Sequence, residues 1–328
     1  MEKFLIKGSS SKGVKGLINC SGAKNAVLPL MASSILFDNT VTLTNVPLGA
    51  NDVQTMITLL KSLGSKVQII KNKKTLKITN KKKHKLLVKY KYISTMRAGV
   101  LAMGALLGKY NKCSTALSGG CSLGPRPIGY HLAGFKKLNC KYSLNKGYIN
   151  IVSPSGIKGG HFRFPKVSVT GTSNLILTSV IANGITTLKN ISIDPEVLEL
   201  IKFLRNGGAR IYNTGKRTIK IYGVKKLNGH QHEVIGDRIE AFSYLCAAAI
   251  TKGKIKIKKI NPKYLTTELK VLKKIGCNIK VEKSSIELNR KYNLTTTYLK
   301  TAPFPGFATD CLPMLMAVLT KAAGKSKI

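Results

Sequence analysis

One pattern of apolar and polar positions recurs along the chain. It begins with a helix-length stretch of small and apolar residues, passes a turn residue, and ends in a short alternating segment typical of a strand. The helical stretches are residues 26–36, 98–107, 174–182, 239–250 and 312–322, and the strand-like segments are 40–43, 113–117, 185–188, 254–257 and 326–328. These copies recur about every 70 residues, which predicts a repeated structural unit.

The second half of each unit is a further helix followed by an edge strand. The helices are predicted over 53–64, 128–139, 195–208 and 266–276, with strands over 66–69, 210–211 and 278–281. Gly64, Gly208 and Gly276 stand where a helix commonly ends in left-handed backbone. Each unit therefore reads β-α-β-α-β-β, repeated four times with a fifth begun, and the fold class is α/β.

The last residue, Ile328, falls inside the strand predicted after the fifth helix. A fifth unit without its second helix and partner strands would leave an apolar face and a strand edge uncovered. We therefore expect this chain to be truncated at its C-terminus, or its remaining units to be supplied otherwise.

Length and composition are typical of a two-domain globular protein in the cytoplasm. The 328 residues are 43% apolar, and we find no apolar run near the ~18 residues needed to span a bilayer, nor a signal peptide. Seven cysteines show no C-x-x-C pair or zinc-finger spacing, which favours reduced thiols and no metal. His230 and His232 lie in a polar connector, and we expect them to be solvated.

The formal net charge of +42 makes nucleic acid the obvious partner to consider. However, 47 of the 55 basic residues are lysines spread through the chain, and aromatic residues are sparse at 6% without tryptophan. The chain thus lacks an interleaved stacking platform, and abundant Lys, Asn and Ile are typical of an AT-rich genome. This composition argues against nucleic-acid binding, which we keep as an alternative.

The segment 119–127 places a thiol, Cys121, in a glycine-rich loop five residues before Arg126. A neighbouring guanidinium can lower a thiol pKa, and arginine binds phosphate or carboxylate through two hydrogen bonds. The pattern therefore indicates thiol chemistry on an anionic substrate. The alternative is a turn that holds a buried, inert cysteine.

Four helix starts carry charged residues in equivalent places of the repeat. Gly22-Ala23-Lys24-Asn25 begins the first helix, and backbone amides with a lysine there favour anion binding, the alternative being a solvated lysine. Met96-Arg97, Asp237-Arg238 and Thr309-Asp310 occupy the corresponding positions, where the default role of Asp237 and Asp310 is helix capping. Repetition of such starts predicts a common anion-binding face.

Together these motifs resemble the UDP-N-acetylglucosamine enolpyruvyl transferases of the MurA type. The matching segments follow the family's order across the whole chain: 22–25, 96–98, 119–127, 166–169, 194–196, 237–240 and 301–310. The resemblance implies an inside-out α/β barrel with two domains, residues 23–235 with the cysteine loop and residues 1–22 plus 236–328. The first strand of the chain would belong to the second of these domains.

The resemblance also implies an activity. The enolpyruvyl group of phosphoenolpyruvate would move to the 3′-hydroxyl of UDP-N-acetylglucosamine with release of phosphate, the first committed step of peptidoglycan synthesis and so of cell-wall biogenesis, cell shape and division. No metal or cofactor is implied, and the partners are these two small molecules, without a membrane.

Site residues follow from the same resemblance. Cys121 would form an adduct with phosphoenolpyruvate, Asp310 would be the general base, and Lys24 would complete the catalytic set. The expected phosphoenolpyruvate ligands are Lys24, Asn25, Arg97 and Arg126. The expected UDP-sugar ligands are Asn25, Arg97, Arg126, Pro127, Ile128, Lys166, Ser168, Val169 and Asp310.

Three departures from the family pattern bear on these expectations. Gly129 stands where the family usually has aspartate, so one nucleotide contact is in question, and Thr170-Gly171 replaces the usual Gly-Ala. A sixfold architecture needs on the order of 90 more residues, so we expect the chain to be weakly active or inactive alone. The alternatives are a non-catalytic remnant, the related 5-enolpyruvylshikimate 3-phosphate synthase, which lacks the cysteine loop, and a basic nucleic-acid-binding protein.

Overall fold

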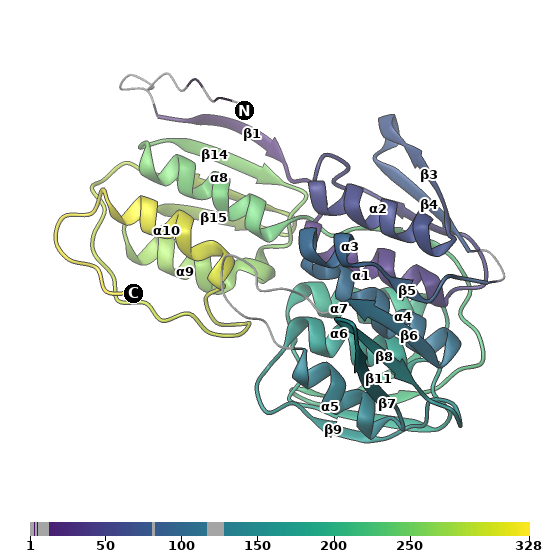
Figure 1. The fold of residues 1–328 in the computed structure, drawn as a ribbon. Coiled ribbons are helices and arrows are strands. Elements are labelled where there is room, and N and C mark those ends of the chain that lie inside the picture. The colour runs from purple at the N-terminus through teal and green to yellow at the C-terminus, as the bar shows by residue number, and fades with distance from the viewer. Residues whose placement is uncertain (1–2, 4, 6–12, 81–82, 117–127) are drawn as a thin grey trace. The chain divides into compact units, whose positions relative to one another are not determined.

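The computed structural model describes residues 3, 5, 13–80, 83–116 and 128–328, and the chain divides into two compact units. Unit 1 comprises Met1–Ser21 with Gly236–Ile328, and unit 2 comprises Gly22–Ile235. The chain passes between them twice, after Ser21 and after Ile235. The first crossing lies one residue before the boundary expected from the sequence. Figure 1 labels many of the elements of both units.

Four four-stranded sheets share one plan, in which a parallel pair of strands is extended by an antiparallel hairpin. Unit 1 has one sheet, ordered β1 (Lys15–Asn19), β14 (Lys254–Lys258), β16 (Ser285–Asn289), β15 (Asn278–Glu282). Unit 2 has three. The first sheet has the order β13 (Gln231–Glu233), β2 (Val41–Thr44), β4 (Thr75–Thr79), β3 (Lys66–Ile70). The second has the order β5 (Leu87–Val88), β6 (Lys112–Ala116), β8 (Tyr148–Val152), β7 (Lys141–Asn145). The third has the order β9 (His161–Arg163), β10 (Ile185–Lys189), β12 (Thr218–Tyr222), β11 (Arg210–Gly215).

Two strands have exchanged sheets. In the β5–β8 and β9–β12 sheets all strands are consecutive in sequence, but β1 pairs in parallel with β14, with Lys15 opposite Lys254. Conversely, β13 pairs in parallel with β2, with Gln231 opposite Thr42. The first strand thus belongs with the C-terminal part of the chain, as the resemblance implied, while the reciprocal place of β13 was not anticipated.

In each β-α-β-α-β-β repeat, the helices lie between strands in the sequence. The helices are α1 (Lys24–Ser33), α2 (Asn51–Leu63), α3 (Tyr90–Thr95), α4 (Leu101–Tyr110), α5 (Gly129–Lys137), α6 (Val169–Ser179), α7 (Pro195–Asn206), α8 (Arg238–Ile250), α9 (Thr266–Lys274) and α10 (Leu312–Leu319). Short 3₁₀ turns lie at Ser34–Leu36, Lys71–Lys73, Arg97–Val100, Pro262–Leu265 and Thr309–Cys311. Positive φ angles at Gly64, Gly208 and Gly276 confirm the predicted helix ends.

One predicted strand is absent. Residues 326–328 form no strand among the described residues, and Lys327 makes only a single parallel bridge, to Tyr298. A strand needs a ladder of successive partners, which one bridge does not supply. The expectation of a strand after α10 was therefore wrong.

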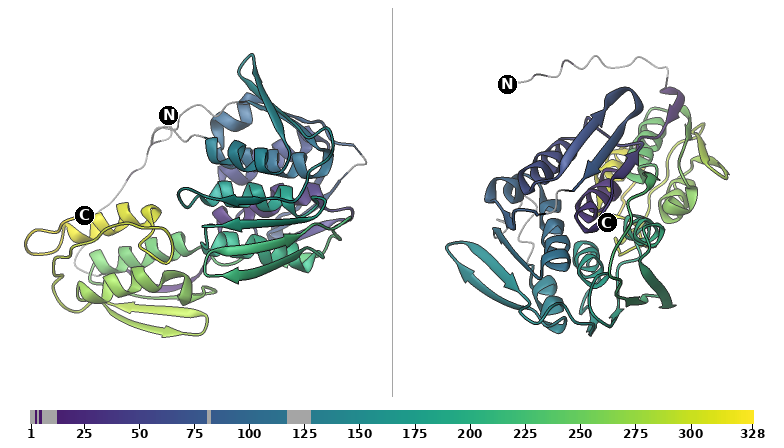
Figure 2. Two further views of the ribbon diagram at one scale, coloured as in Figure 1. Left: turned by 90° about the horizontal axis from the view of Figure 1, so that it is seen from below. Right: turned by 90° about the vertical axis from the view of Figure 1, so that its right-hand side faces the viewer.

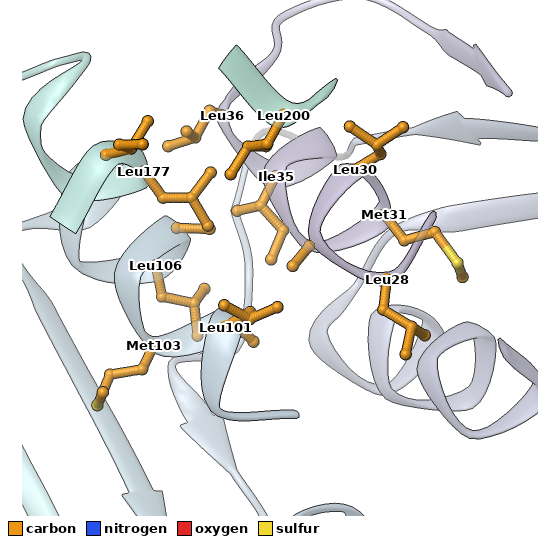
Figure 3. Close-up of a cluster of buried hydrophobic side chains, with 14 of the residues drawn as sticks. Leu28, Leu30, Met31, Ile35, Leu36, Leu101, Met103, Leu106, Leu177 and Leu200 are labelled. Atoms are coloured by element: carbon orange, nitrogen blue, oxygen red, sulfur yellow. The ribbon is translucent and has the colours of Figure 1, made fainter. Parts of the chain in front are cut away.

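Three helices of unit 2, α1, α4 and α6, are buried on nearly every side, and the sheets of this unit lie outside them (Figure 2). Residues 26–33 of α1, 101–108 of α4 and 171–179 of α6 are all buried. A helix that is apolar all round requires surrounding protein rather than solvent. Side chains including Leu30, Leu101, Leu177 and Leu200 meet where α1, α4, α6 and α7 pack together (Figure 3).

Unit 1 is smaller and packs its helices in a layer on one sheet. Helix α8 contacts β14 and β16, α9 contacts β15, and α10 lies against α8, as the left view of Figure 2 shows. Phe242 and Phe307 stack edge to face at 5.8 Å in its core. Within the described ranges, no helix is both long enough and apolar enough to cross a membrane.

Candidate functional site

The first helix of unit 2 begins at Lys24, directly after the chain enters this unit. The Ala23 amide donates to the Ile235 carbonyl at 2.7 Å, so the two crossings lie side by side here. A Cβ at position 22 would collide with the Asn45 carbonyl oxygen. Gly22 is therefore required by this close approach of two backbones.

Lys24 and Asn25 stand at the start of α1, where no side chain caps the helix. The Lys24 ammonium forms an ion pair with the Asp52 carboxylate of α2 at 3.0 Å, and the Lys24 side chain is 45% exposed. Asn25 is exposed. Such a pair contributes only about 0–1 kcal/mol, so an anionic ligand can compete with Asp52 for this lysine. Lys24 is thus both half exposed and ion-paired, rather than only solvated.

Arg97 opens the turn Arg97–Val100 that leads into α4, the equivalent place in the next repeat. Helix α1 packs against this turn, so the segments that begin at Lys24 and at Arg97 are neighbours within unit 2. Cys121, Arg126 and Pro127 lie outside the described residues. The next described residue is Ile128, which is half-buried and lies just before α5.

Helix α6 brings a third candidate segment to unit 2. Ser168 caps this helix, and its hydroxyl oxygen accepts from the Gly171 amide at 3.1 Å. Lys166 is exposed, and Val169 is 43% exposed. This cap explains why α6 begins at Val169, five residues earlier than predicted.

A buried polar network joins these segments beneath the surface. The Asn174 side-chain amide donates to His131 Nδ1 at 2.8 Å and to the Val100 carbonyl at 3.0 Å, and its oxygen accepts from the Gly104 amide at 3.0 Å. Burial lowers the pKa of His131 to about 4, which keeps its ring neutral. One amide thus connects α4, α5 and α6. The role of Asn174 was not predicted from the sequence, although a side-chain amide within an apolar helix indicates a buried hydrogen-bonding group.

Two of the three departures from the family pattern, at positions 129 and 170, lie near His131. The Thr170 hydroxyl is 3.5 Å from His131 Nε2, so this residue contacts the ring that Asn174 holds. Gly129, two residues before His131, is exposed, and a Cβ added there would meet nothing within 4 Å. A side chain at position 129 would therefore point into open space.

In unit 1, Asp237 and Glu240 have structural roles. The Asp237 carboxylate accepts from the amides of Ile239 at 2.8 Å and Glu240 at 3.1 Å, which confirms it as the cap of α8. Glu240 in turn accepts from the Ser21 amide at 2.8 Å. These carboxylates fasten the chain just before it leaves unit 1.

Asp310 does not cap a helix, contrary to the default expectation. It is exposed and lies inside the turn Thr309–Cys311, whose N-cap is Ala308, and neither this turn nor α10 has a side-chain cap. The turn follows the segment 301–308, which is held by its own backbone contacts and by α9.

The six described cysteines are free and buried: Cys20, Cys113, Cys140, Cys246, Cys277 and Cys311. Burial raises the pKa of Cys277 to about 11 and of Cys20 and Cys140 to about 12, and raises the pKa values of the other three further. For Cys20 the charges of Glu240 and Asp237 add to the effect of burial. All six are therefore neutral thiols near pH 7.

The described residues contain no group of three side chains suited to hold a metal ion. The expectation that both connector histidines are solvated was wrong for His232, which is buried and hydrogen-bonded to Glu199 at 2.7 Å. The reason is that β13 joins the sheet of β2 next to α7, whose Phe203 ring lies 5.2 Å from the ring of His232.

The chain is similar to known proteins along its whole length. The profile of the EPSP synthase family, described as 3-phosphoshikimate 1-carboxyvinyltransferase, matches residues 9–328. Three curated relatives are each named UDP-N-acetylglucosamine 1-carboxyvinyltransferase. The one from Pelagibacter ubique is 43% identical over 100% of this chain and 78% of the relative. Those from Endomicrobium trichonymphae and Rickettsia conorii are 40% and 41% identical over the whole chain, covering 77% and 78% of the relatives.

Solved structures show a similar fold at low identity. The enolpyruvyl transferase NikO from Streptomyces tendae matches with a TM-score of 0.84 and 16% identity over 96% of this chain and 74% of that one. EPSP synthase from Acinetobacter baumannii matches with a TM-score of 0.72 and 18% identity over 97% and 74%. The expected inside-out α/β fold of the enolpyruvyl transferases is thereby confirmed.

Proposed function

The chain belongs to the EPSP synthase family, and from this premise we propose that it is a UDP-N-acetylglucosamine 1-carboxyvinyltransferase. It transfers the enolpyruvyl group of phosphoenolpyruvate to the 3′-hydroxyl of UDP-N-acetylglucosamine and releases phosphate, a step of peptidoglycan synthesis. The observation that carries this proposal is the 43% identity, over the entire chain, to a relative of that name. The solved EPSP synthases share only 18% identity, which disfavours the alternative of a shikimate-pathway enzyme.

Phosphoenolpyruvate is a polyanion, and the proposed clamp for it is cationic. Lys24, Arg97 and Arg126 would hold its phosphate and carboxylate, with Asn25 beside them, and would stabilise the charge that develops as phosphate leaves. The support from unit 2 is that Lys24 is half exposed in a weak ion pair and that its helix packs against the turn that begins with Arg97.

Asp310 is the proposed general base. Its carboxylate would take the proton of the sugar 3′-hydroxyl while that oxygen bonds to C2 of phosphoenolpyruvate and C3 gains a proton. The resulting tetrahedral adduct would lose phosphate from C2 and a proton from C3, which restores the double bond. Exposure of Asp310 in the turn Thr309–Cys311 supports this role.

Cys121 is the proposed nucleophile that forms an adduct with phosphoenolpyruvate: its sulfur would bond to C2 while its proton passes to C3, and reversal of this addition would release phosphoenolpyruvate for the sugar 3′-hydroxyl. Arg126 stands five residues later in the sequence, and a guanidinium close to the thiol would favour the thiolate. The other six thiols are buried with raised pKa values, so they offer no competing nucleophile near pH 7.

The nucleotide-sugar would contact the segments around α5 and α6. Pro127 and Ile128 precede α5, and Lys166, Ser168 and Val169 begin α6, with Asn25, Arg97, Arg126 and Asp310 completing the set. Support comes from the exposure of Lys166 and Val169 and from the Asn174 amide, which ties these helices together.

Both partners in this proposal are small molecules, and the chain acts in the cytoplasm without a membrane or nucleic acid. The free thiols of all six described cysteines support a reducing compartment. The positive charge then has no role in the reaction beyond the residues of the clamp.

The test is phosphate release from phosphoenolpyruvate by the 328-residue chain, with and without UDP-N-acetylglucosamine. Release that depends on the sugar nucleotide would support the proposal. If none is seen, the assay is repeated on a chimera that adds the parts of the Pelagibacter ubique relative outside the match. Activity of the chimera alone would retain the assignment for these residues, whereas no release from either would favour a non-catalytic remnant. Steep salt dependence of RNA or DNA binding would favour the nucleic-acid alternative instead.

A further inference from the structure

The segment that carries Asp310 is closed on itself before it reaches that residue. In Thr301–Asp310 the Ala302 amide donates to the Phe307 carbonyl at 3.2 Å, and the Gly306 amide donates to the Pro303 carbonyl at 2.9 Å. These two bonds shape the segment but fix nothing about its place on unit 1. Its position depends on contacts with other elements.

The start of α9 supplies two of those contacts. The Thr267 hydroxyl donates to the Pro305 carbonyl at 2.5 Å, and the Glu268 carboxylate accepts from the Ala308 amide at 3.0 Å. Ala308 lies two residues before Asp310. Glu268 therefore holds the backbone at the last turn before the proposed base.

Glu268 is only 1% exposed, in a chain with 13 acidic residues. A buried carboxylate costs several kcal/mol unless hydrogen bonds and opposite charges compensate. An apolar residue would fill the same space without that cost. The presence of a glutamate at position 268 is therefore better explained by its hydrogen bond to the Ala308 amide than by packing alone.

Helix α8 contacts the same segment. The Arg238 guanidinium, on a side chain that is also buried, lies 5.6 Å from the centre of the Phe304 ring, and the Phe307 ring packs on Phe242 in the core. The buried Cys311 thiol lies within electrostatic reach of Glu268, Arg238 and Asp310. Glu268, Arg238 and Asp310 thus all act electrostatically on this one thiol, which directly follows Asp310 in the chain.

We propose that Glu268 is a positioning residue for the transfer reaction, because its bond to the Ala308 amide fixes where Asp310 presents its carboxylate. This inference rests on the proposed function and on Asp310 as its base. Misplacing a catalytic group by about 1 Å can cost about 100-fold in rate, so the bond affects turnover more than substrate binding.

Two substitutions separate the hydrogen bond from the charge. Glu268→Ala removes the acceptor and is expected to lower kcat about 10- to 100-fold, with KM for both substrates changed less than about threefold. Glu268→Gln keeps an oxygen that can accept from Ala308 and is expected to stay within about threefold of the parent kcat. A glutamine variant as impaired as the alanine variant would overturn the proposal.

Glu199 provides a matched control, since it is a buried glutamate of unit 2 paired with His232. Glu199→Ala should lower the melting temperature without acting through Asp310. The comparison is made in an Asp310→Asn background, where Glu268→Ala should cause no further loss of kcat, whereas any effect of Glu199→Ala should persist. Fully additive losses for Glu268→Ala and Asp310→Asn would contradict a shared mode of action.

Amide hydrogen exchange gives a reading that does not require activity. In Glu268→Ala the Ala308 amide should exchange at least about tenfold faster, while the helices of unit 2 keep their protection. Unchanged exchange at Ala308 would refute the positioning role whatever the kinetics show. If exchange changes but Asp310→Asn keeps full activity, the base assignment fails while the structural role of Glu268 stands.

Discussion

The Lys24 ammonium lies 3.0 Å from the Asp52 carboxylate at the start of α1, and the two side chains are 45% and 32% exposed. In the free protein this carboxylate holds the lysine that the proposal assigns to phosphoenolpyruvate. Asp52 therefore competes with the substrate for one cation.

Replacing Asp52 should favour the substrate. We expect Asp52→Asn to lower KM for phosphoenolpyruvate by up to about fivefold, because a surface pair contributes at most about 1 kcal/mol. The melting temperature should change little for the same reason. Initial rates of phosphate release at varied phosphoenolpyruvate concentrations measure the effect, and Asp38→Asn, which removes the partner of Lys109, is the control. A higher KM in Asp52→Asn would show that the carboxylate orients Lys24 rather than competing.

Thiol labelling should single out Cys121. The six described cysteines are buried, and burial holds their pKa values at about 11 or above, so their thiolate fractions near pH 7 are negligible. A chromogenic disulfide reagent should therefore modify one thiol rapidly in the native protein and all seven in denaturant. Fosfomycin, an epoxide that mimics phosphoenolpyruvate, should block that one reaction.

Cys121→Ser supplies the control for this labelling, since it should abolish the rapid phase. Rapid modification of a second thiol in that variant would contradict the burial of the other six.

The free energy of unfolding should decrease as pH is lowered, because His131 titrates. Burial lowers its pKa from 6.5 to about 4 in the folded chain, so between these values the unfolded chain binds the additional proton. The contribution of this ring is complete above pH 6.5 and decreases as pH falls toward 4, by at most about 3 kcal/mol. Urea unfolding at pH 7, 5.5 and 4.5 measures this loss. His131→Asn, although less stable at pH 7, should show a shallower decline, and an equal slope in both proteins would assign the effect to other groups.

Gly129→Asp should be tolerated and should strengthen binding of the nucleotide-sugar. Position 129 is exposed, open to a Cβ, and begins α5, where a carboxylate stabilises the helix by about 0.3–1 kcal/mol. The added acceptor should lower KM for UDP-N-acetylglucosamine severalfold. Gly129→Ala makes the same backbone change without a carboxylate, so equal KM values in the two variants would exclude a contact through the new side chain.

The sequence alone located most of the elements, because their signals are local. Glycine at positions 64, 208 and 276 marked three helix ends that the positive φ angles confirm. The apolar stretch 26–36 corresponds to α1 and the turn after it. Such features depend on neighbours within a few residues, and they are readable without a fold.

The candidate site was readable only in part. The motifs around Lys24 and Asp310 were found by their charge at helix starts, but capping by Asp310 was wrong because its turn begins two residues earlier, at Ala308. Glu268 gave no signal, since a glutamate in the first turn of an amphipathic helix is ordinary. Its burial arises from the segment that folds over it.

By itself the sequence determined the period of about 70 residues, the alternation of helices and strands, and the order of motifs that assigns the family. The family resemblance implied that the first strand belongs to the C-terminal domain, but only the tertiary structure decided that β1 pairs with β14 and that β13 pairs with β2. Parallel strands from distant parts of the chain pair through backbone hydrogen bonds, which any sequence can make. Their partners are therefore set by where the chain crosses between its units, and not by the residues within the strands.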